Sequence, residues 1–163
     1  MVATLEREIK LRFDSPDAAR AAIVAIGARP LHGRRLQDDR LLDRADNQLQ
    51  QQRSVLRVRT EDGRCVLTFK GPVQPSLMKL REEIETAVAD TTLLLKILEA
   101  LGFQVWFRYQ KYREEFSLDE VTVAVDETPV GTYVEIEGTE AGINAAATAL
   151  GRASSCSTAR SME

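Results

Sequence analysis

The feature of this sequence that most constrains its fold is a two-residue alternation of charged and apolar side chains. In the opening segment, Glu6, Glu8 and Lys10 occupy every second position, with Arg7 and Ile9 between them. Successive side chains of a β-strand point to opposite faces, so the three charges would share one face of a strand. In a single strand, this pattern is typical of a sheet with one solvated face.

Six further segments repeat the alternation, and apolar residues separate most of their aligned polar positions. The aligned side chains are Arg57 and Arg59; Thr68 and Lys70; Lys79, Arg81, Glu83 and Glu85; Lys111 and Arg113; Thr122 and Asp126; Glu135 and Glu137. Acids and bases are nearly equal in number on these faces. A sheet that closes into a barrel would enclose its polar face in a tunnel and leave the apolar face for helices to cover.

Three helices are predicted between the strands. The first has Ser15 as its cap and Pro16 at its first position, and it ends at Gly27. The second spans roughly residues 91–101, with Asp90 as its cap, and the third spans roughly residues 141–150. Each is followed by glycine. With about eight strands joined mostly as antiparallel neighbours, we predict an α+β protein, an eight-stranded antiparallel barrel with helices packed outside.

Composition and charge exclude several classes of protein. The 163 residues, 44% apolar and 29% charged, predict one soluble domain over 1–163. The net charge of −3 indicates no bias toward nucleic acid or membrane surfaces. No apolar run reaches the ~20 residues of a membrane span, and the start has no signal-peptide core. Cys65 and Cys156 have no metal or redox spacing, which favours a cytoplasmic location. A homodimer is left open.

Mixed acids and bases around a tunnel suit a polyanion that binds together with a divalent cation. Carboxylate oxygens are ligands that Mg²⁺ and Mn²⁺ prefer, and arginine and lysine bind phosphate oxygens. The single histidine, His32, argues against a histidine-rich zinc site. We therefore favour a site for a polyanion and a divalent cation over a solvated sheet face.

A series of motifs in chain order resembles the CYTH superfamily, also called triphosphate tunnel metalloenzymes. The motifs are ExExK at 6–10, LRxR at 56–59, LTxKGP at 67–72, RxExE at 81–85, KxR at 111–113, Asp126, and GxxxEIEG at 131–138. The resemblance extends to about Gly151. Within the superfamily, TFKGP and the EIEG-helix-LG ending resemble the class IV adenylyl cyclase branch, which also contains triphosphatase-like members.

Two departures from that branch bear on substrate identity. Its second strand usually carries a Gln-x-Asp-x-aromatic-aromatic-Asp stretch, whereas residues 37–43 read QDDRLLD, with leucine at both aromatic positions. The closing segment has Ser161-Met162 where a Ser-Tyr pair is expected.

By position, the resemblance implies the residues of the site. Metal ligands would be Glu6, Glu8, Glu135 and Glu137, with Asp126, Glu83 and Glu85 nearby, and the cofactor would be Mg²⁺ or Mn²⁺. Triphosphate would be bound by Lys10, Arg57, Arg59, Lys70, Arg81, Lys111 and Arg113. Glu6, Glu8 and Lys10 would be the catalytic residues. Glu85 can equally be interpreted as a salt-bridge partner of an arginine.

Three aromatic residues, Trp106, Phe107 and Tyr109, are expected to pack beneath the helix at 91–101. A base-stacking platform is the alternative, because Phe107 and Tyr109 share the parity of Lys111.

Several charged residues are expected outside the site. Glu82 and Glu114 have the opposite parity to their neighbours and are predicted to face outward. Lys79 is expected at the tunnel mouth and His32 at the surface. Arg34 and Arg35 are expected in a solvated loop, and the alternative is that they extend the phosphate-binding field.

The residues and the resemblance together favour hydrolysis of an inorganic or organic triphosphate, as in tripolyphosphatases and thiamine triphosphatases. The alternative is a class IV adenylyl cyclase that converts ATP to cyclic AMP and pyrophosphate. A non-catalytic module that binds polyphosphate or nucleotide is a third hypothesis.

Overall fold

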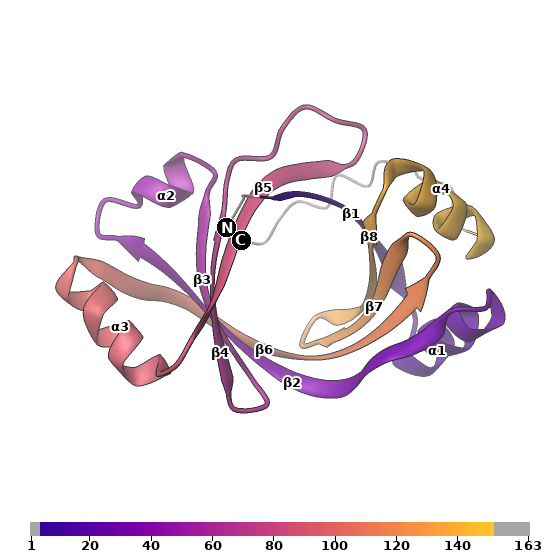
Figure 1. Cartoon of the computed structure of the whole chain (residues 1–163), viewed down its shortest axis with the longest axis horizontal. Helices are drawn as coiled ribbons and strands as arrows, with labels where there is room; N and C mark the ends of the chain where they lie inside the picture. Colours follow the sequence, from indigo (N-terminus) through magenta and orange to yellow (C-terminus); the bar gives the residue numbers. More distant parts are fainter. Residues whose placement is uncertain (1–3, 152–163) are drawn as a thin grey trace.

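A computed structural model describes residues 4–151 and shows a closed antiparallel barrel (Figure 1). Within this range there are eight strands: β1 (Thr4–Phe13), β2 (Arg29–Arg44), β3 (Val55–Glu61), β4 (Arg64–Lys70), β5 (Lys79–Val88), β6 (Phe103–Leu118), β7 (Val121–Thr128) and β8 (Gly131–Gly138). Their order around the barrel is β1-β5-β4-β3-β2-β6-β7-β8, and every neighbouring pair is antiparallel. The predicted fold class is confirmed.

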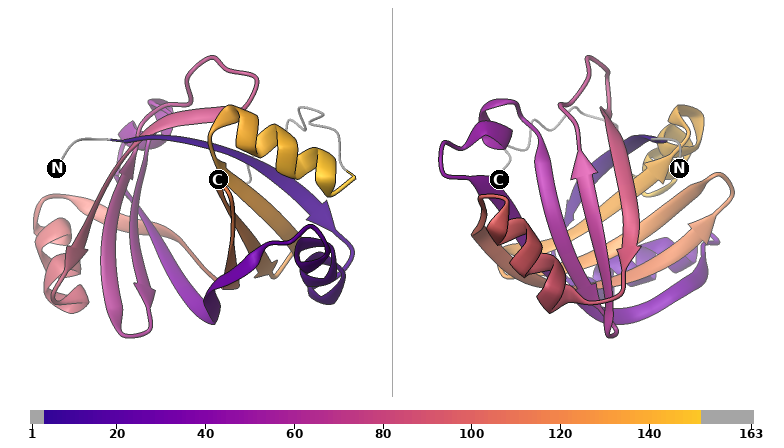
Figure 2. Two further views of the ribbon diagram at one scale, coloured as in Figure 1. Left: turned by 45° about the vertical axis from the view of Figure 1, so that its right-hand side comes forward. Right: turned by 60° about the vertical axis from the view of Figure 1, so that its left-hand side comes forward.

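The described residues also form α1 (Pro16–Ala25), α2 (Gln48–Gln51), α3 (Thr91–Ala100) and α4 (Glu140–Ala149), which lie outside the barrel (Figures 1 and 2). The predicted caps explain where α1 and α3 begin. The Ser15 hydroxyl accepts a hydrogen bond from the amide of Ala18 at 3.0 Å, and the Asp90 carboxylate accepts one from Leu93 at 2.9 Å. No helix within residues 4–151 is long and apolar enough to cross a membrane.

The one-turn helix α2 was not predicted. It depends on the buried carboxylate of Asp43, which accepts hydrogen bonds from the backbone amides of Leu49 and Gln50 at 3.0 Å each. These bonds satisfy amides at the start of the turn that would otherwise have no partner. The turn is therefore organised by a side chain of β2 rather than by its own propensity.

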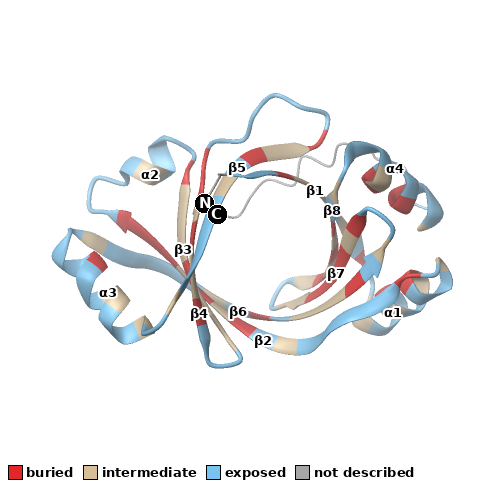
Figure 3. Ribbon diagram, in the orientation of Figure 1, coloured by how far each residue is buried: buried red, intermediate tan, exposed pale blue. Residues whose placement is uncertain are grey.

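Two apolar clusters separate the helices from the outer face of the sheet, and Figure 3 shows buried positions on both helices and strands. The larger one joins α1 and α4 to the strands through fully buried side chains such as Ile23, Ile143, Val123 and Ile136. The smaller one brings Leu98 of α3 against Leu42, Val58 and Cys65. Because the apolar side chains of the strands face outward and pack against the helices, the charged side chains that alternate with them line the lumen.

Residues 32–35 lie in β2, so the expectation that Arg34 and Arg35 occupy a solvated loop is wrong. Irregularities in the β2–β6 register on either side of His32 let the strand continue through Gly33. Arg34 faces outward and binds Glu127, whereas Arg35 binds Glu115. Cys156 and the Ser161-Met162 pair lie outside the described residues.

Candidate functional site

The residues that the sequence analysis assigned to the site come together around the lumen from seven strands, all but β2. Cross-strand register explains the meeting. Glu8 of β1 lies opposite Glu137 of β8, and Lys10 lies opposite Glu135. On the other side of β1, Glu6 lies opposite Arg81. The strand order therefore brings residues from the two ends of the sequence into one site.

One group of lumen charges, here named the Asp126 cluster, contains Asp126, Lys111, Arg113, Glu135 and Lys10. Asp126 is 1% exposed; Lys111 Nζ lies 2.9 Å from its Oδ2, and Arg113 donates to both of its oxygens at 2.7 and 2.6 Å. Arg113 also donates to Glu135, which Lys10 approaches to 3.2 Å. Burial alone would raise the pKa of Glu135, but the adjacent cations Arg113 and Lys111 hold it well below its ordinary value.

A second group, the carboxylate cluster, contains Glu6, Glu8, Glu83 and Glu137. Lys70 Nζ lies 2.7 Å from Glu6 and 3.6 Å from Glu83. Lys79 Nζ lies 3.3 Å from Glu8, so this lysine joins the site although it was expected only at the tunnel mouth.

Negative charge is in excess in the carboxylate cluster. Burial, reinforced by the neighbouring charges of Glu6, Glu8 and Glu83, raises the pKa of Glu137 to about 7. Burial and the charges of Glu135 and Glu6 also raise the pKa of Glu8. Carboxylates that repel one another in this way are the donor set that a divalent cation prefers. The cluster therefore fits the implied Mg²⁺ or Mn²⁺.

As placed among residues 4–151, no three acidic, histidine or cysteine side chains converge closely enough to hold a metal ion. Glu6 is instead turned to Lys70, and Glu8 to Lys79. A bound cation would have to take these carboxylates from the two lysines, which would then be released toward an anion.

A third group lies where β2, β3 and β4 adjoin. Arg59 donates two hydrogen bonds of 2.7 Å to Asp39, which has no exposed surface. Against the effect of burial, these bonds lower the pKa of Asp39. Arg57 is less well paired, because its Nη2 lies 3.5 Å from Thr68 and 4.0 Å from Glu85, while its buried Nε has no partner. Burial and the charge of Arg59 lower the pKa of Arg57.

Glu85 lies in this third group. Thr68 donates to it at 2.9 Å, and its side chain is 49% exposed. The structure thus places Glu85 beside an arginine, as one of its two interpretations expected.

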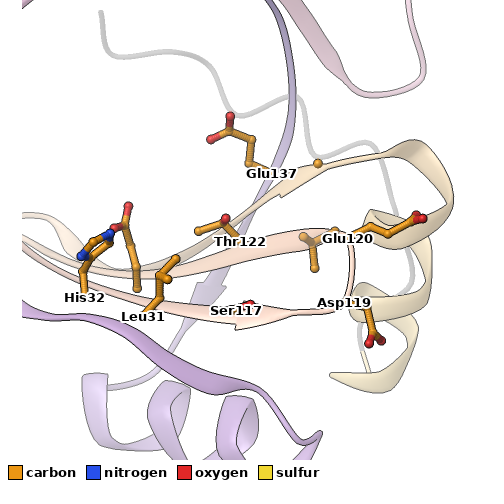
Figure 4. Close-up of a pocket in the computed structure, with 10 residues that line it drawn as sticks. Leu31, His32, Ser117, Asp119, Glu120, Thr122 and Glu137 are labelled. Atoms are coloured by element: carbon orange, nitrogen blue, oxygen red, sulfur yellow. The ribbon is translucent and has the colours of Figure 1, made fainter.

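A pocket of about 560 Å³ lies at one end of the barrel (Figure 4). Glu137 of β8 and Thr122 of β7 line it from neighbouring strands, and His32 of β2 is one of its exposed lining residues. Gly138 ends β8 at φ 153°, where a side chain would collide with the backbone carbonyl of Glu120. The glycine of the EIEG motif therefore allows the backbone just after Glu137 to pass close to the turn between β6 and β7.

A family model of the CYTH domain matches residues 4–154. The chain belongs to the CYTH domain family. Its lumen is thus the tunnel that the motif resemblance predicted.

Other CYTH-like proteins resemble this one over most of their length. A candidate adenylate cyclase of Methanocaldococcus jannaschii is 28% identical over 141 residues, which are 86% of this chain and 80% of that protein. The PH1012 protein of Pyrococcus horikoshii has a TM-score of 0.77 at 25% identity and 90% coverage of both chains. A candidate adenylyl cyclase from Hippeastrum, described as having a dominant triphosphatase activity, has a TM-score of 0.63 at 25% identity, with 82% of this chain and 78% of that one covered.

The CYTH tunnel contains polar residues that the sequence analysis did not assign to the site. They are Asp39, Gln37, Arg35, Glu61 and Glu115. Gln37 is 2% exposed, and its Oε1 has no hydrogen-bond partner. The signal that could have found Asp39 is parity, because Gln37, Asp39 and Asp43 alternate along β2 as the recognised charges do on the other strands.

The expectation that Trp106 and Phe107 pack beneath α3 is wrong. Their exposed fractions are 36% and 43%, and neither belongs to the apolar cluster under that helix. Phe103, at the start of β6, packs there instead. Tyr109 faces the lumen beside Asp39, where burial and that carboxylate raise the pKa of its phenol.

Proposed function

We propose that this CYTH domain is a divalent-metal-dependent enzyme that hydrolyses an inorganic or organic triphosphate in its tunnel. The observation that carries the proposal is the pairing of lumen acids with lumen bases. Each lysine or arginine that leaves its carboxylate becomes available to phosphate, and each carboxylate released becomes available to a cation. A triphosphate and its metal can therefore replace these ion pairs with new ones of the same kind.

The lumen cations differ in how firmly the protein holds them. Arg57 is preorganised for phosphate, because it is buried and weakly paired. Lys111 and Arg113 are held by Asp126, which fixes their direction rather than competing for metal. Arg59, Lys70 and Arg81 would complete the phosphate contacts. Fixed cations of this kind stabilise the charge that develops on phosphate oxygens during hydrolysis.

Lys10 is suited to stabilise the leaving oxygen. Its side chain is 45% exposed, and its ammonium group lies 3.2 Å from a carboxylate oxygen of Glu135 and 5.5 Å from the centroid of the Tyr133 ring, so it can turn toward substrate from a half-exposed position. A donor placed at the developing charge contributes about 3 kcal/mol to lowering the barrier.

The implied cation would be held by the carboxylate cluster. Glu6, Glu8 and Glu137 would supply its oxygens, with Glu135, Asp126, Glu83 and Glu85 nearby. When bound, a divalent cation neutralises phosphate charge and makes water more acidic. Glu6 and Glu8 would then be free of Lys70 and Lys79, which could bind the phosphates.

A second candidate is adenylate cyclase activity, and what supports it is the description of the relatives from Methanocaldococcus jannaschii and Hippeastrum. The triphosphatase activity described for the Hippeastrum protein supports the first candidate. The same cations could serve both reactions. In hydrolysis water attacks the terminal phosphorus and orthophosphate is released, whereas in cyclisation the ribose 3′ oxygen attacks the α-phosphorus and pyrophosphate leaves.

A product analysis separates the two candidates. The purified protein, with Mg²⁺ or Mn²⁺, is given tripolyphosphate, thiamine triphosphate and ATP in parallel at neutral and alkaline pH. We expect orthophosphate from at least one substrate and no cyclic AMP. Cyclic AMP with pyrophosphate from ATP would establish the cyclase, and no turnover of any substrate would contradict both candidates.

A further inference from the structure

The aromatic side chains of Trp106, Phe107 and Tyr109 form a continuous row along β6. The ring centroids of Trp106 and Phe107 are 5.7 Å apart, and those of Phe107 and Tyr109 are 5.6 Å apart. Adjacent residues of a regular strand point to opposite faces, so the first of these contacts requires an irregularity.

A β-bulge supplies that irregularity. Phe107 lies opposite Leu41, but Val105 lies opposite the very next residue, Leu42, so Trp106 is an extra residue in β6. Bulges change the direction of side chains and are frequent beside active sites. Here the bulge brings the indole of Trp106 to the side of the strand that carries Phe107, Tyr109 and the lumen.

This row adjoins the phosphate-binding cations. Phe107 lies opposite Leu41, which in turn lies opposite Arg57. With a strand spacing of about 4.8 Å, the backbone of Phe107 is about 10 Å from that of Arg57. A ligand bound to Arg57 through phosphate could therefore place an attached group over the rings.

Two of the three rings, those of Trp106 and Phe107, are exposed although they are aromatic. In the described part of the chain, residues 103–111 of β6 pair with β2 alone, since β7 begins its pairing at Tyr112. Leu41, which lies opposite Phe107 on β2, is buried, whereas Phe107 itself stays exposed. Exposed aromatic groups beside a charged cavity are typical of a ligand site.

We propose that the three side chains form a stacking subsite, here named the aromatic subsite, for the planar ring of an organic triphosphate. The occupant must carry both an anion and a flat apolar group, because the rings are continuous with the lumen cations. A nucleoside base and a thiamine ring system share this chemistry. The inference deepens the proposed function and rests on it, and it favours organic over inorganic triphosphate as substrate.

The chain offers a direct reporter, because Trp106 is its one tryptophan. The protein with Mg²⁺ is titrated with adenosine 5′-(β,γ-imido)triphosphate and with diimidotriphosphate, an inorganic counterpart without a ring. We expect the adenosine compound to change the tryptophan emission at saturation and the inorganic compound to leave it nearly unchanged. Equal responses to both would overturn the inference.

The decisive variant is Phe107→Ala. Loss of a base-aromatic stack should raise the Kd of the adenosine compound at least about fivefold and leave the Kd of diimidotriphosphate, from calorimetry, within about twofold. Tyr112→Leu is the matched control, because Tyr112 is on the same strand but lies outside the tunnel under Arg34. If Phe107→Ala fails to fold by circular dichroism, Phe107→Leu is measured instead.

The possible results separate the two proposals. A variant that weakens both ligands equally, or neither, overturns the aromatic subsite and leaves the proposed function standing. A wild-type protein that binds neither ligand, with Mg²⁺ or Mn²⁺, contradicts the proposed function. The ratio of kcat/KM for ATP and thiamine triphosphate, in wild type and Phe107→Ala, then shows which ring the subsite takes.

Discussion

The Asp126 cluster and the carboxylate cluster line the same tunnel with the same residue types, yet their charges are balanced in opposite ways. Asp126 receives three hydrogen bonds from two cations, and the pKa of its neighbour Glu135 is held well below the ordinary value. In the carboxylate cluster, acids lie beside acids, and the pKa of Glu137 is raised to about 7. The first cluster is complete in itself, whereas the second is left with charge that only a further cation can neutralise.

A tunnel with nearly equal numbers of acids and bases therefore does not pair its charges equally well along its whole length. Completely paired charges stabilise a geometry, because separating them would leave a buried ion without a partner. Incompletely paired charges store unfavourable energy that a ligand can release on binding. Activity should therefore be most sensitive to the carboxylate cluster, and folding stability most sensitive to the Asp126 cluster.

The largest effect on activity is expected from Glu8→Gln. Removing one candidate metal ligand should lower kcat at least about 10²–10³-fold. The free energy of unfolding should stay the same or rise slightly, because burial and like charges raise the pKa of Glu8. The measurement is phosphate release together with urea unfolding.

Glu82→Gln is the control for this variant, since Glu82 is exposed and lies one position from the lumen face. A Glu8→Gln protein with the activity of wild type would show that the carboxylate cluster holds no essential cation.

The largest effect on stability is expected from Asp126→Asn. This change leaves Lys111 and Arg113 buried with one partner fewer, and breaking a buried pair costs about 3–5 kcal/mol. The free energy of unfolding is measured by urea denaturation. The control is Asp38→Asn, which loses an ion pair with Arg108 of similar geometry, with Arg108 53% exposed, and should cost less than about 1 kcal/mol. Equal losses of unfolding free energy in the two variants would contradict the special contribution of the Asp126 cluster to stability.

A smaller effect on stability is expected from Asp39→Asn, which tests whether the Asp39–Arg59 pair stabilises the fold as the Asp126 cluster does. Despite burial, the hydrogen bonds from Arg59 lower the pKa of Asp39 in the folded protein. A carboxyl group with a depressed folded pKa adds stability above its unfolded pKa of about 3.9, and this stability is lost as the pH falls through the folded value. We expect the difference in unfolding free energy between wild type and Asp39→Asn to narrow below about pH 4. A difference that stays constant down to pH 2 would contradict the assignment.

The barrel was predictable because one physical rule acts on every strand. Side chains alternate between an apolar layer under the helices and a charged lumen, so parity alone places Glu135 inside and Ile136 outside. The caps at Ser15 and Asp90 could be predicted for a similar reason, since each cap bonds an amide only three positions away.

The features that were missed depend on contacts that the alternation of side chains along a strand does not specify. The turn of α2 is organised by Asp43, and the position of Trp106 depends on the pairing of β6 with β2. Parity shows that Asp39 and Arg59 face the same way, but only the strand order shows that they meet. The selection of partners among many similar charges is a property of the closed barrel, and local sequence does not contain it.

The pairing of β1 with β8 also has a consequence for how the protein folds. Within residues 4–151 the first strand pairs with the last, so the contact of Glu8 with Glu137 joins segments that are about as far apart in the sequence as any two strands. Pairing between strands so far apart in sequence has a high entropic cost and is slow to form. An intermediate that lacks this seam can keep Glu6, Glu8 and Glu83 together through the pairing of β1 with β5, but it lacks Glu137. Such an intermediate has most of the hydrogen-bonded sheet but an incomplete carboxylate cluster, so the affinity for a divalent cation would report whether the seam between β1 and β8 has closed.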